Sequence, residues 1–254
     1  MSYTPYELLT VLTCREMAGG RTVFAGVGIP LVAAIMAKRT HTPDLIIVVE
    51  GGSIDPQVVP GRLPISTNEM RIGHGAQMLA PITDIFLLAQ RGALDLGIIG
   101  GAQIDRFGNV NTTVVGPYEA PKLRLPGSGG ANDIASLCRR VILVTMHERR
   151  RFVPKVDFVT SPGYLTGGRS RSEAGLIFGA ITRVVTDLGV FGFDEETKAM
   201  RVASVHRGVS LDDVRERTGF ALSVPERVPV TDAPTSAELE AVRDVDADQR
   251  YLKA

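Results

Sequence analysis

The chain has 254 residues, enough to bury the core of one α/β domain. Its 28 basic and 28 acidic residues balance to a formal net charge of zero, Trp is absent, and aromatic residues make up 6%. These values exclude a strongly basic surface for nucleic acid or an anionic membrane, and they argue against an aromatic platform for single strands. The sequence has no signal-peptide pattern and no run of about 18 apolar residues, so we expect a cytoplasmic protein.

The first elements are predicted from capping and apolar spacing. Thr4 and Pro5 suit the start of a helix that ends before the glycine pair at residues 19–20. A short strand is expected over residues 22–25. Pro30 suits the first turn of a second helix, which ends near residue 38.

An unbroken apolar run over residues 45–49 is typical of a central strand covered on both faces. The order strand, helix, strand implies a right-handed βαβ unit and a parallel sheet. Glu50 follows the run directly, so it is predicted at the carboxyl end of a buried strand. Open α/β sheets bind their ligands at that edge.

The remaining elements complete an α/β fold, with a long loop expected over residues 56–75. We expect helices over residues 82–90, 210–217 and 236–243, and a helical pattern through Ala135 and Leu137 after the loop at residues 127–132. Strands are expected over residues 96–100, 141–145, 182–186, 190–193 and 199–205. The predicted fold is an open, mostly parallel sheet flanked by helices, with a β-rich C-terminal extension. We predict one domain over residues 1–254, with a core over about residues 4–220 and the extension over 221–254.

Glu50 has two interpretations. A carboxylate at a strand end can simply accept backbone hydrogen bonds or meet water. Alternatively, Gly51 and Gly52 let a substrate approach the backbone, and free amides beside a carboxylate could stabilise an oxyanion while the carboxylate attacks an acyl carbon.

Two glycine-containing loops are candidate binding segments. Gly26 and Gly28 precede a helix whose amides could hold an anion, although they lack the third glycine of the dinucleotide fingerprint and could form only a tight turn. The second loop, over residues 127–132, lacks the lysine of a nucleotide P-loop. It could be a flexible loop without a ligand, or its backbone amides could bind an anion. Its candidate residues are Gly127, Ser128, Gly129, Gly130 and Asn132.

The histidines and cysteines show no metal-ligand spacing, so we predict no metal site. Cys14 and Cys138 both lie in amphipathic patterns and are interpreted as core residues. His147 begins a basic segment over residues 147–151, interpreted as a solvated turn or as a contact with a phosphate or a partner subunit, and not as a catalytic group.

Several motifs, in order, carry a resemblance to a known family. They occupy residues 27–31, 43–52, 99–105, 108–111, 127–132, 147–150 and 159–163. Together they resemble the B (β) subunit of family I CoA transferases, and most closely the glutaconate CoA-transferase type. The similarity extends from about residue 6 to about residue 220.

The resemblance implies a ping-pong reaction in which Glu50 carries CoA as a thioester between an acyl-CoA and a carboxylic acid. It also implies coenzyme A as a substrate rather than a permanent cofactor, and an α subunit in an α2β2 or larger assembly. The family usually has Ser or Asn after the glutamate, where this chain has Gly51. A CoA-ester hydrolase on the same fold and a non-catalytic partner subunit stay open as alternatives.

Overall fold

The computed structural model describes residues 2–253, which form two compact units. The first unit contains the residues up to Ile98 and those from Ala233 onward, and the second contains Ile99–Asp232. The end of the predicted C-terminal extension therefore belongs to the first unit. The assignment of the whole chain to one domain stays a prediction.

The first unit has parallel strands at its centre. Strand β1 (Thr22–Ala25) lies between β2 (Ile46–Val48) and β5 (Leu96–Ile99), and it is parallel to both. This confirms the predicted parallel pairing of the βαβ unit. Two short strands that the sequence did not predict, β3 (Ser53–Ile54) and β4 (Met78–Leu79), continue this side of the sheet in antiparallel pairing.

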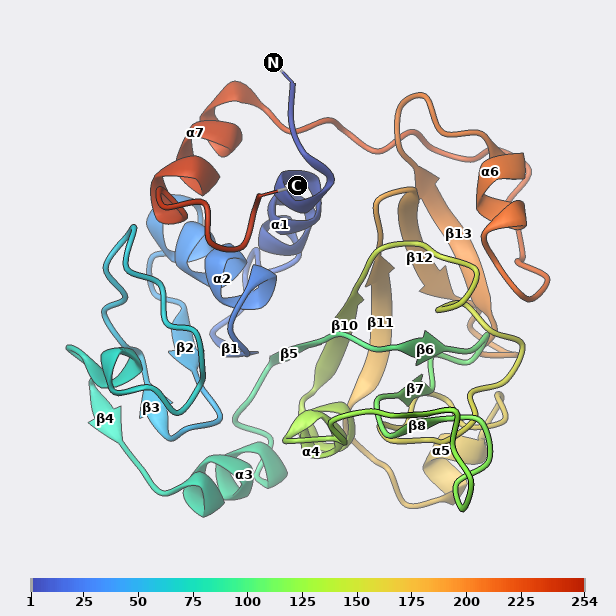
Figure 1. The fold of residues 1–254 in the computed structure, drawn as a ribbon, viewed down its shortest axis with the longest axis horizontal. Helices are drawn as coiled ribbons and strands as arrows, with labels where there is room; N and C mark the ends of the chain where they lie inside the picture. Colours follow the sequence, from blue (N-terminus) through green and yellow to red (C-terminus); the bar gives the residue numbers. More distant parts are fainter. Residues whose placement is uncertain (1, 254) are drawn as a thin grey trace. The chain divides into compact units, whose positions relative to one another are not determined.

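Three helices of this unit pack together, as the upper left of Figure 1 shows. They are α1 (Pro5–Arg15), α2 (Ile29–Thr40) and α7 (Ser236–Val245). Thr4 and Thr235 cap α1 and α7 through capping boxes. Helix α3 (Ile82–Gln90) has the predicted bounds, and the predicted loop contains one short 3-10 helix, η1 (Met70–Gly73).

The second unit combines one parallel and two antiparallel strand pairs. Strand β10 (Arg140–Val144) is parallel to β11 (Ala180–Val185), and β12 (Gly189–Phe193) and β13 (Met200–Val205) add antiparallel neighbours. The strands predicted over residues 182–186, 190–193 and 199–205 are thus confirmed, with bounds that differ by at most two residues. The other elements are the pair β6 (Gln103–Ile104) and β7 (Val110–Asn111), the pair β8 (Val114–Val115) and β9 (Leu123–Arg124), and helices α4 (Ala131–Leu137), α5 (Ser170–Glu173) and α6 (Leu211–Glu216).

The α/β class is confirmed, with parallel strands at the centre, antiparallel strands added beside them and flanking helices. Both cysteines are core residues, as expected, because Cys14 is 1% and Cys138 0% exposed. Burial raises the pKa of each thiol to about 12. A thiol held neutral in this way is a poor nucleophile.

Candidate active site

Glu50 occupies a tight turn at the carboxyl end of β2. The Gly52 N–H donates to the Val49 carbonyl (3.0 Å), and the Val49 N–H donates to the Ser53 carbonyl (2.9 Å), which closes the turn into a β2–β3 hairpin. The Glu50 side chain is half-exposed. Within residues 2–253 its carboxylate accepts no hydrogen bond and forms no ion pair. The carboxylate is therefore available to a ligand.

The two glycines after Glu50 are required by close backbone contacts. A Cβ on Gly51 would lie 2.1 Å from the Thr67 carbonyl oxygen, and a Cβ on Gly52 would lie 1.9 Å from the Ala80 carbonyl oxygen. Gly52 also has a φ of +97°. The sequence predicted that the missing side chains of Gly51 and Gly52 leave room for a substrate. In the structure, the Thr67 and Ala80 carbonyls occupy that room. Substrate contact by these two residues stays a prediction.

The backbone amides of the turn offer hydrogen-bond donors beside the carboxylate. In the part of the chain that the structure describes, the N–H groups of Glu50 and Gly51 donate to no protein acceptor. Two unpaired amides next to a carboxylate can bind an oxyanion.

The loop between β1 and α2 reaches the same edge of the sheet. Phe24 on β1 pairs with Val48 on β2, and Gly26 and Glu50 each follow two residues later. Gly28 precedes α2 with a φ of +87°, a conformation that favours glycine, and no side chain caps the helix. A Cβ on Gly26 would meet no atom within 4 Å. Uncapped amides and open space fit the predicted anion contact.

The glycine-rich loop before α4 belongs to the second unit. The Gly127 N–H donates to the Thr112 carbonyl (2.8 Å), and the Ser128 hydroxyl donates to the Gly129 carbonyl (2.9 Å). Gly130 precedes α4 without a side-chain cap, and Asn132 is exposed. A ligand contact by this loop stays a prediction.

Comparison with known proteins identifies the family. The coenzyme A transferase family profile matches residues 6–217. The chain belongs to the coenzyme A transferase family. The resemblance found in the sequence is therefore confirmed.

Two CoA-transferase chains, both named as B subunits, are among the similar proteins. The B subunit of 3-oxoadipate CoA-transferase from Pseudomonas knackmussii is 38% identical over 97% of this chain and 94% of its own length. The B subunit of glutaconate CoA-transferase from Acidaminococcus fermentans is 38% identical over 99% and 96%. The crystal structure of glutaconate coenzyme A-transferase from the same organism has a TM-score of 0.92 at 36% identity, covering 100% of this chain and 98% of the other.

A hydrolase subunit is also similar. The cholesterol ring-cleaving hydrolase IpdB subunit of Rhodococcus jostii is 30% identical over 91% of this chain and 90% of its own length.

A cluster of buried polar side chains in the second unit contains two of the family-like motifs. Asp105 accepts hydrogen bonds from the backbone N–H groups of Phe107 (2.9 Å) and Asn109 (3.1 Å). Asn111 donates to the side chain of Gln103 (2.6 Å). Burial raises the pKa of Asp105. These bonds give the motifs a structural role in this unit.

His147 is a core residue, so the solvated-turn interpretation is wrong for it. It is 1% exposed, its ring stacks on Phe152 at 3.9 Å, and it forms hydrogen bonds with the hydroxyls of Thr186 (3.2 Å) and Thr218 (2.9 Å). Burial lowers its pKa to about 3, so the ring is neutral at pH 7. The sequence did not predict the burial of His147, because the charged residues that follow it indicated a solvated turn. Arg150 in the same segment is exposed, as that interpretation expects.

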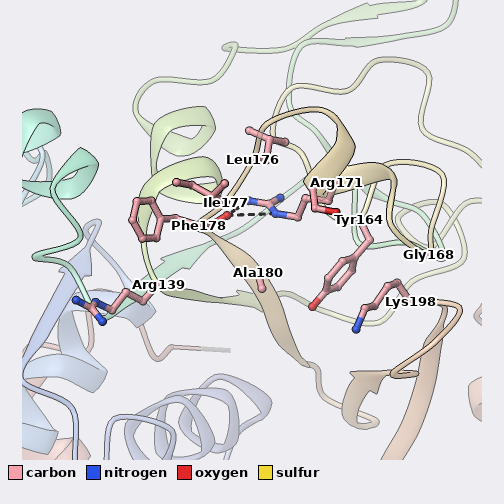
Figure 2. A pocket seen from close by; sticks show the side chains of 10 residues that line it. Arg139, Tyr164, Gly168, Arg171, Leu176, Ile177, Phe178, Ala180 and Lys198 are labelled. Carbon is pink, nitrogen blue, oxygen red and sulfur yellow. Dashed lines mark hydrogen bonds between the residues drawn. The ribbon is translucent and has the colours of Figure 1, made fainter.

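The second unit also contains a cavity of 330 Å³, drawn in Figure 2. Arg139, Arg171 and Lys198 line it together with Tyr164 and several apolar residues. The Arg171 guanidinium donates to backbone carbonyls, among them that of Phe178 (Figure 2). None of the predicted site residues lines this cavity.

The sequence did not single out two residues that lie against the candidate site residues Gly51 and Gly28. Asn68 lies against Gly51, since a Cβ there would be 2.8 Å from Asn68 Oδ1. Tyr251 lies beside Gly28, 3.8 Å from a Cβ built there, and its hydroxyl donates to the Pro64 carbonyl. Burial raises the pKa of Tyr251. Both contacts join distant parts of the chain, so no local pattern could have predicted them.

The described residues show neither a metal cluster nor a membrane-spanning helix. Across residues 2–253, no three His, Cys, Asp or Glu side chains gather where they could hold a metal ion. No helix in that range has the length and apolar character needed to cross a bilayer.

Proposed function

We propose that this chain is the B (β) subunit of an enzyme that transfers coenzyme A between an acyl-CoA and a carboxylic acid. Glu50 is the nucleophile of the proposal. The observation that carries it is the half-exposed Glu50 carboxylate, which has no hydrogen-bond or ion-pair partner within residues 2–253, beside the unpaired amides of Glu50 and Gly51.

In the proposed reaction, a Glu50 oxygen attacks the thioester carbonyl carbon of the donor. The C–S bond breaks, CoA leaves as a thiolate, and an acyl-glutamyl anhydride remains. The thiolate then attacks the glutamyl carbonyl carbon, which releases the donor acid as a carboxylate and leaves CoA on Glu50 as a thioester. The acceptor carboxylate repeats these steps in reverse order. Each step, as written, exchanges one bond to a carbonyl carbon for another, so none of them needs a proton transfer.

A carboxylate is a weak nucleophile, so the rate must come from binding and electrostatics. In the proposal, the N–H groups of Glu50 and Gly51, which have no acceptor among the described residues, stabilise the oxyanion. Binding of the remote parts of CoA supplies further free energy for reaching the transition state. We assign a CoA contact to the loop at Gly26 and Gly28, because CoA carries phosphates that backbone amides can bind. The loop at residues 127–132 of the second unit is a separate candidate for such a contact, for the same reason.

We propose an α subunit as the partner, in an α2β2 or larger assembly. Two of the similar proteins are named as B subunits, and both match almost all of this chain. We expect the chain alone to be inactive, because the partner should complete the acyl pocket. Transfer activity of the purified single chain would contradict this expectation.

The donor and acceptor acids are best sought among dicarboxylates first. The two CoA transferases that are 38% identical to this chain are named for 3-oxoadipate and glutaconate, which are both dicarboxylates. Co-purifying the partner and screening acyl-CoA donors against carboxylic acids would identify the pair.

A CoA-ester hydrolase on the same fold is the second candidate. The similar chain from Rhodococcus jostii, 30% identical, is named as the subunit of a hydrolase, although of a ring-cleaving one. The assembled enzyme should be incubated with acyl-CoA and then with borohydride, which reduces a glutamyl thioester. Loss of activity that depends on acyl-CoA supports covalent transfer, and full activity after the treatment contradicts it.

The variant Glu50→Ala separates catalysis from a purely structural role. We expect loss of transfer with an unchanged assembly, measured by size-exclusion chromatography. Unchanged turnover would instead support a non-catalytic partner subunit.

A further inference from the structure

A loop over residues 64–71 lies against Gly51, the residue that directly follows Glu50. Gly51 has no side chain, and the place of its Cβ lies 2.1 Å from the Thr67 carbonyl oxygen and 2.8 Å from Asn68 Oδ1. The Asn68 carboxamide therefore lies against the backbone of the residue that directly follows Glu50. Both residues belong to the first unit.

The Asn68 carboxamide has no partner of its own. The residue is exposed, and among the residues that the structure describes its side chain neither donates nor accepts a hydrogen bond. Its backbone N–H donates to the Ser66 hydroxyl (3.3 Å), which leaves the side chain free for a ligand. A side-chain amide offers two N–H donors and one acceptor.

The loop that carries Asn68 is held at several points. The Ile65 N–H donates to Glu69 Oε2 (2.7 Å), and Glu69 forms an ion pair with Arg71. The Ser53 hydroxyl on β3 donates to the Ile72 carbonyl (2.7 Å). These bonds hold the loop on either side of Asn68 against β3, and preorganisation of this kind makes a donor effective in catalysis.

The Pro64 end of this loop is anchored separately. The Tyr251 hydroxyl of the C-terminal segment donates to the Pro64 carbonyl. The same tyrosine ring lies beside Gly28 at the start of α2. The C-terminal segment thus connects the loop to the second backbone segment at this edge of the sheet.

We infer that Asn68 is a catalytic residue that donates a hydrogen bond to the glutamyl oxyanion; this rests on the proposed function of Glu50. When the CoA thiolate adds to the Glu50 carbonyl carbon, the electron pair of the C=O bond moves to its oxygen. Asn68 Nδ2–H stabilises that charge together with the unpaired turn amides. The pair then re-forms the C=O bond as the acyl carboxylate leaves.

The test compares Asn68→Ala and Asn68→Asp in the enzyme assembled with its partner subunit. Asp has the shape of Asn but lacks the N–H donor and adds a negative charge. We expect kcat to fall about 100-fold in the Ala variant and at least as far in the Asp variant, with KM for acyl-CoA within about threefold of wild type. Formation of the thioester in a single turnover should slow by the same factor as kcat.

A role in packing alone makes the opposite prediction, because Asp fills the same space as Asn. An active Asp variant beside an impaired Ala variant would therefore overturn the inference. So would kcat within twofold of wild type in both variants. Gln90→Ala is the matched control, since it removes another exposed side-chain amide, at the end of α3, and should leave kcat unchanged.

The thioester itself separates this inference from the proposed function. If wild type forms a borohydride-sensitive thioester and the Asn68 variants form it at the wild-type rate, only the role of Asn68 is wrong. If wild type forms none and Glu50→Ala turns over normally, the function of Glu50 is wrong and the role of Asn68 is wrong with it.

Discussion

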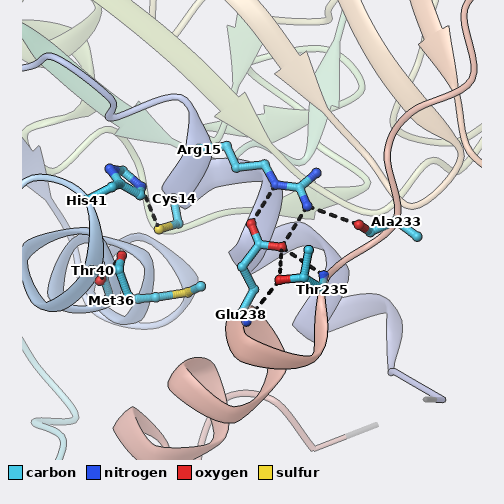
Figure 3. A network of polar contacts seen from close by, with 8 residues as sticks. All are labelled: Cys14, Arg15, Met36, Thr40, His41, Ala233, Thr235 and Glu238. Atoms are coloured by element: carbon cyan, nitrogen blue, oxygen red, sulfur yellow. Dashed lines mark hydrogen bonds and ion pairs between the residues drawn. The ribbon is translucent and has the colours of Figure 1, made fainter.

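Arg15 and Glu238 lie 223 residues apart in the sequence and form a paired contact (Figure 3). Arg15 Nε donates to Glu238 Oε1 and Arg15 Nη2 donates to Oε2, each at 2.7 Å. Glu238 also completes the capping box of α7 with Thr235, and Arg15 Nη2 donates to the Ala233 carbonyl (3.0 Å). This contact fixes the start of the segment that returns to the first unit.

We expect Glu238→Gln to lower the free energy of unfolding by about 1–3 kcal/mol at pH 7. The hydrogen bonds from Arg15 hold the pKa of Glu238 at about 2, below its ordinary value of 4.5. Between these two values the unfolded chain binds a proton that the folded chain does not. The stabilisation is therefore complete above about pH 4.5 and is lost as the pH falls toward 2. Denaturant titrations of both proteins at pH 7 and pH 3 should show a smaller difference at pH 3.

Asp244→Asn is the control for this prediction. The ion pair between Arg39 and Asp244 is exposed on both sides, with side chains 48% and 65% accessible. Exposed pairs contribute about 0–1 kcal/mol. Equal effects of the two substitutions would contradict a special role for Glu238.

Much of the fold could be predicted from local pattern alone. Burial imposes a strict spacing on apolar side chains, and this spacing predicted β2 from the apolar run at residues 45–49 and α3 from residues 82–90. Strands β3 and β4 were missed, since each has only two residues and too few positions to show a period. The return of α7 to the first unit depends on pairs such as Arg15 and Glu238, and no local window contains both residues.

The candidate site was only partly predictable for the same reason. Glu50 stood out because a charged residue ends an apolar run. The need for glycine at position 51 could not be predicted in this way. The Thr67 carbonyl that excludes a side chain there lies 16 residues further along the chain. Asn68 and Tyr251 lie in polar segments with no period, and only the folded chain places them near Gly51 and Gly28.

The buried His147 should make the protein sensitive to acid. Burial lowers its pKa to about 3, and the charge of Arg217 acts in the same direction. Between about pH 6.5 and pH 3 the unfolded chain holds a proton on this ring and the folded chain does not, so stability falls with the pH in this window. The contribution is about 1.4 kcal/mol per pH unit.

The variant His147→Phe tests this contribution, because it keeps a ring against Phe152 but removes the titrating group. We expect the free energy of unfolding to depend less on pH between 6.5 and 3 than in wild type. His74→Gln, at an exposed position, controls for the loss of a histidine. An unchanged slope in His147→Phe would contradict the assignment.

Arg171 should be essential to the stability of the second unit. The residue is 6% exposed, and its guanidinium donates to the carbonyls of Ala135, Pro162, Gly163 and Phe178. Burial lowers its pKa to about 10. Lysine has only three donors at a single point, so we expect Arg171→Lys to lower the free energy of unfolding by about 2–4 kcal/mol.

Arg169→Lys is the matched control for Arg171→Lys, because the Arg169 side chain is 88% exposed. Thermal unfolding should show a lower midpoint for Arg171→Lys alone. Similar midpoints for the two variants would mean that the four carbonyls find other donors.

Gly51→Ala should displace the Asn68 loop. Its Cβ would lie 2.1 Å from the Thr67 carbonyl oxygen, a backbone atom that can move only with its segment. We expect a loss of about 1–3 kcal/mol in the free energy of unfolding and faster amide exchange over residues 65–72. Transfer should fall as well, since Asn68 and the turn amides lose their positions together.

Gly26→Ala separates this clash from the general cost of changing a glycine at the same edge of the sheet. A Cβ there meets no atom within 4 Å, and the residue is not among those with positive φ. The free energy of unfolding should change by less than about 0.5 kcal/mol, with unchanged exchange over residues 65–72. The methyl group would, however, occupy the open space assigned to CoA, so KM for acyl-CoA should rise. Faster amide exchange over residues 65–72 in Gly26→Ala would contradict this explanation. It would show that the loop responds to any substitution at this edge, and not specifically to the clash between Thr67 and a Cβ on residue 51.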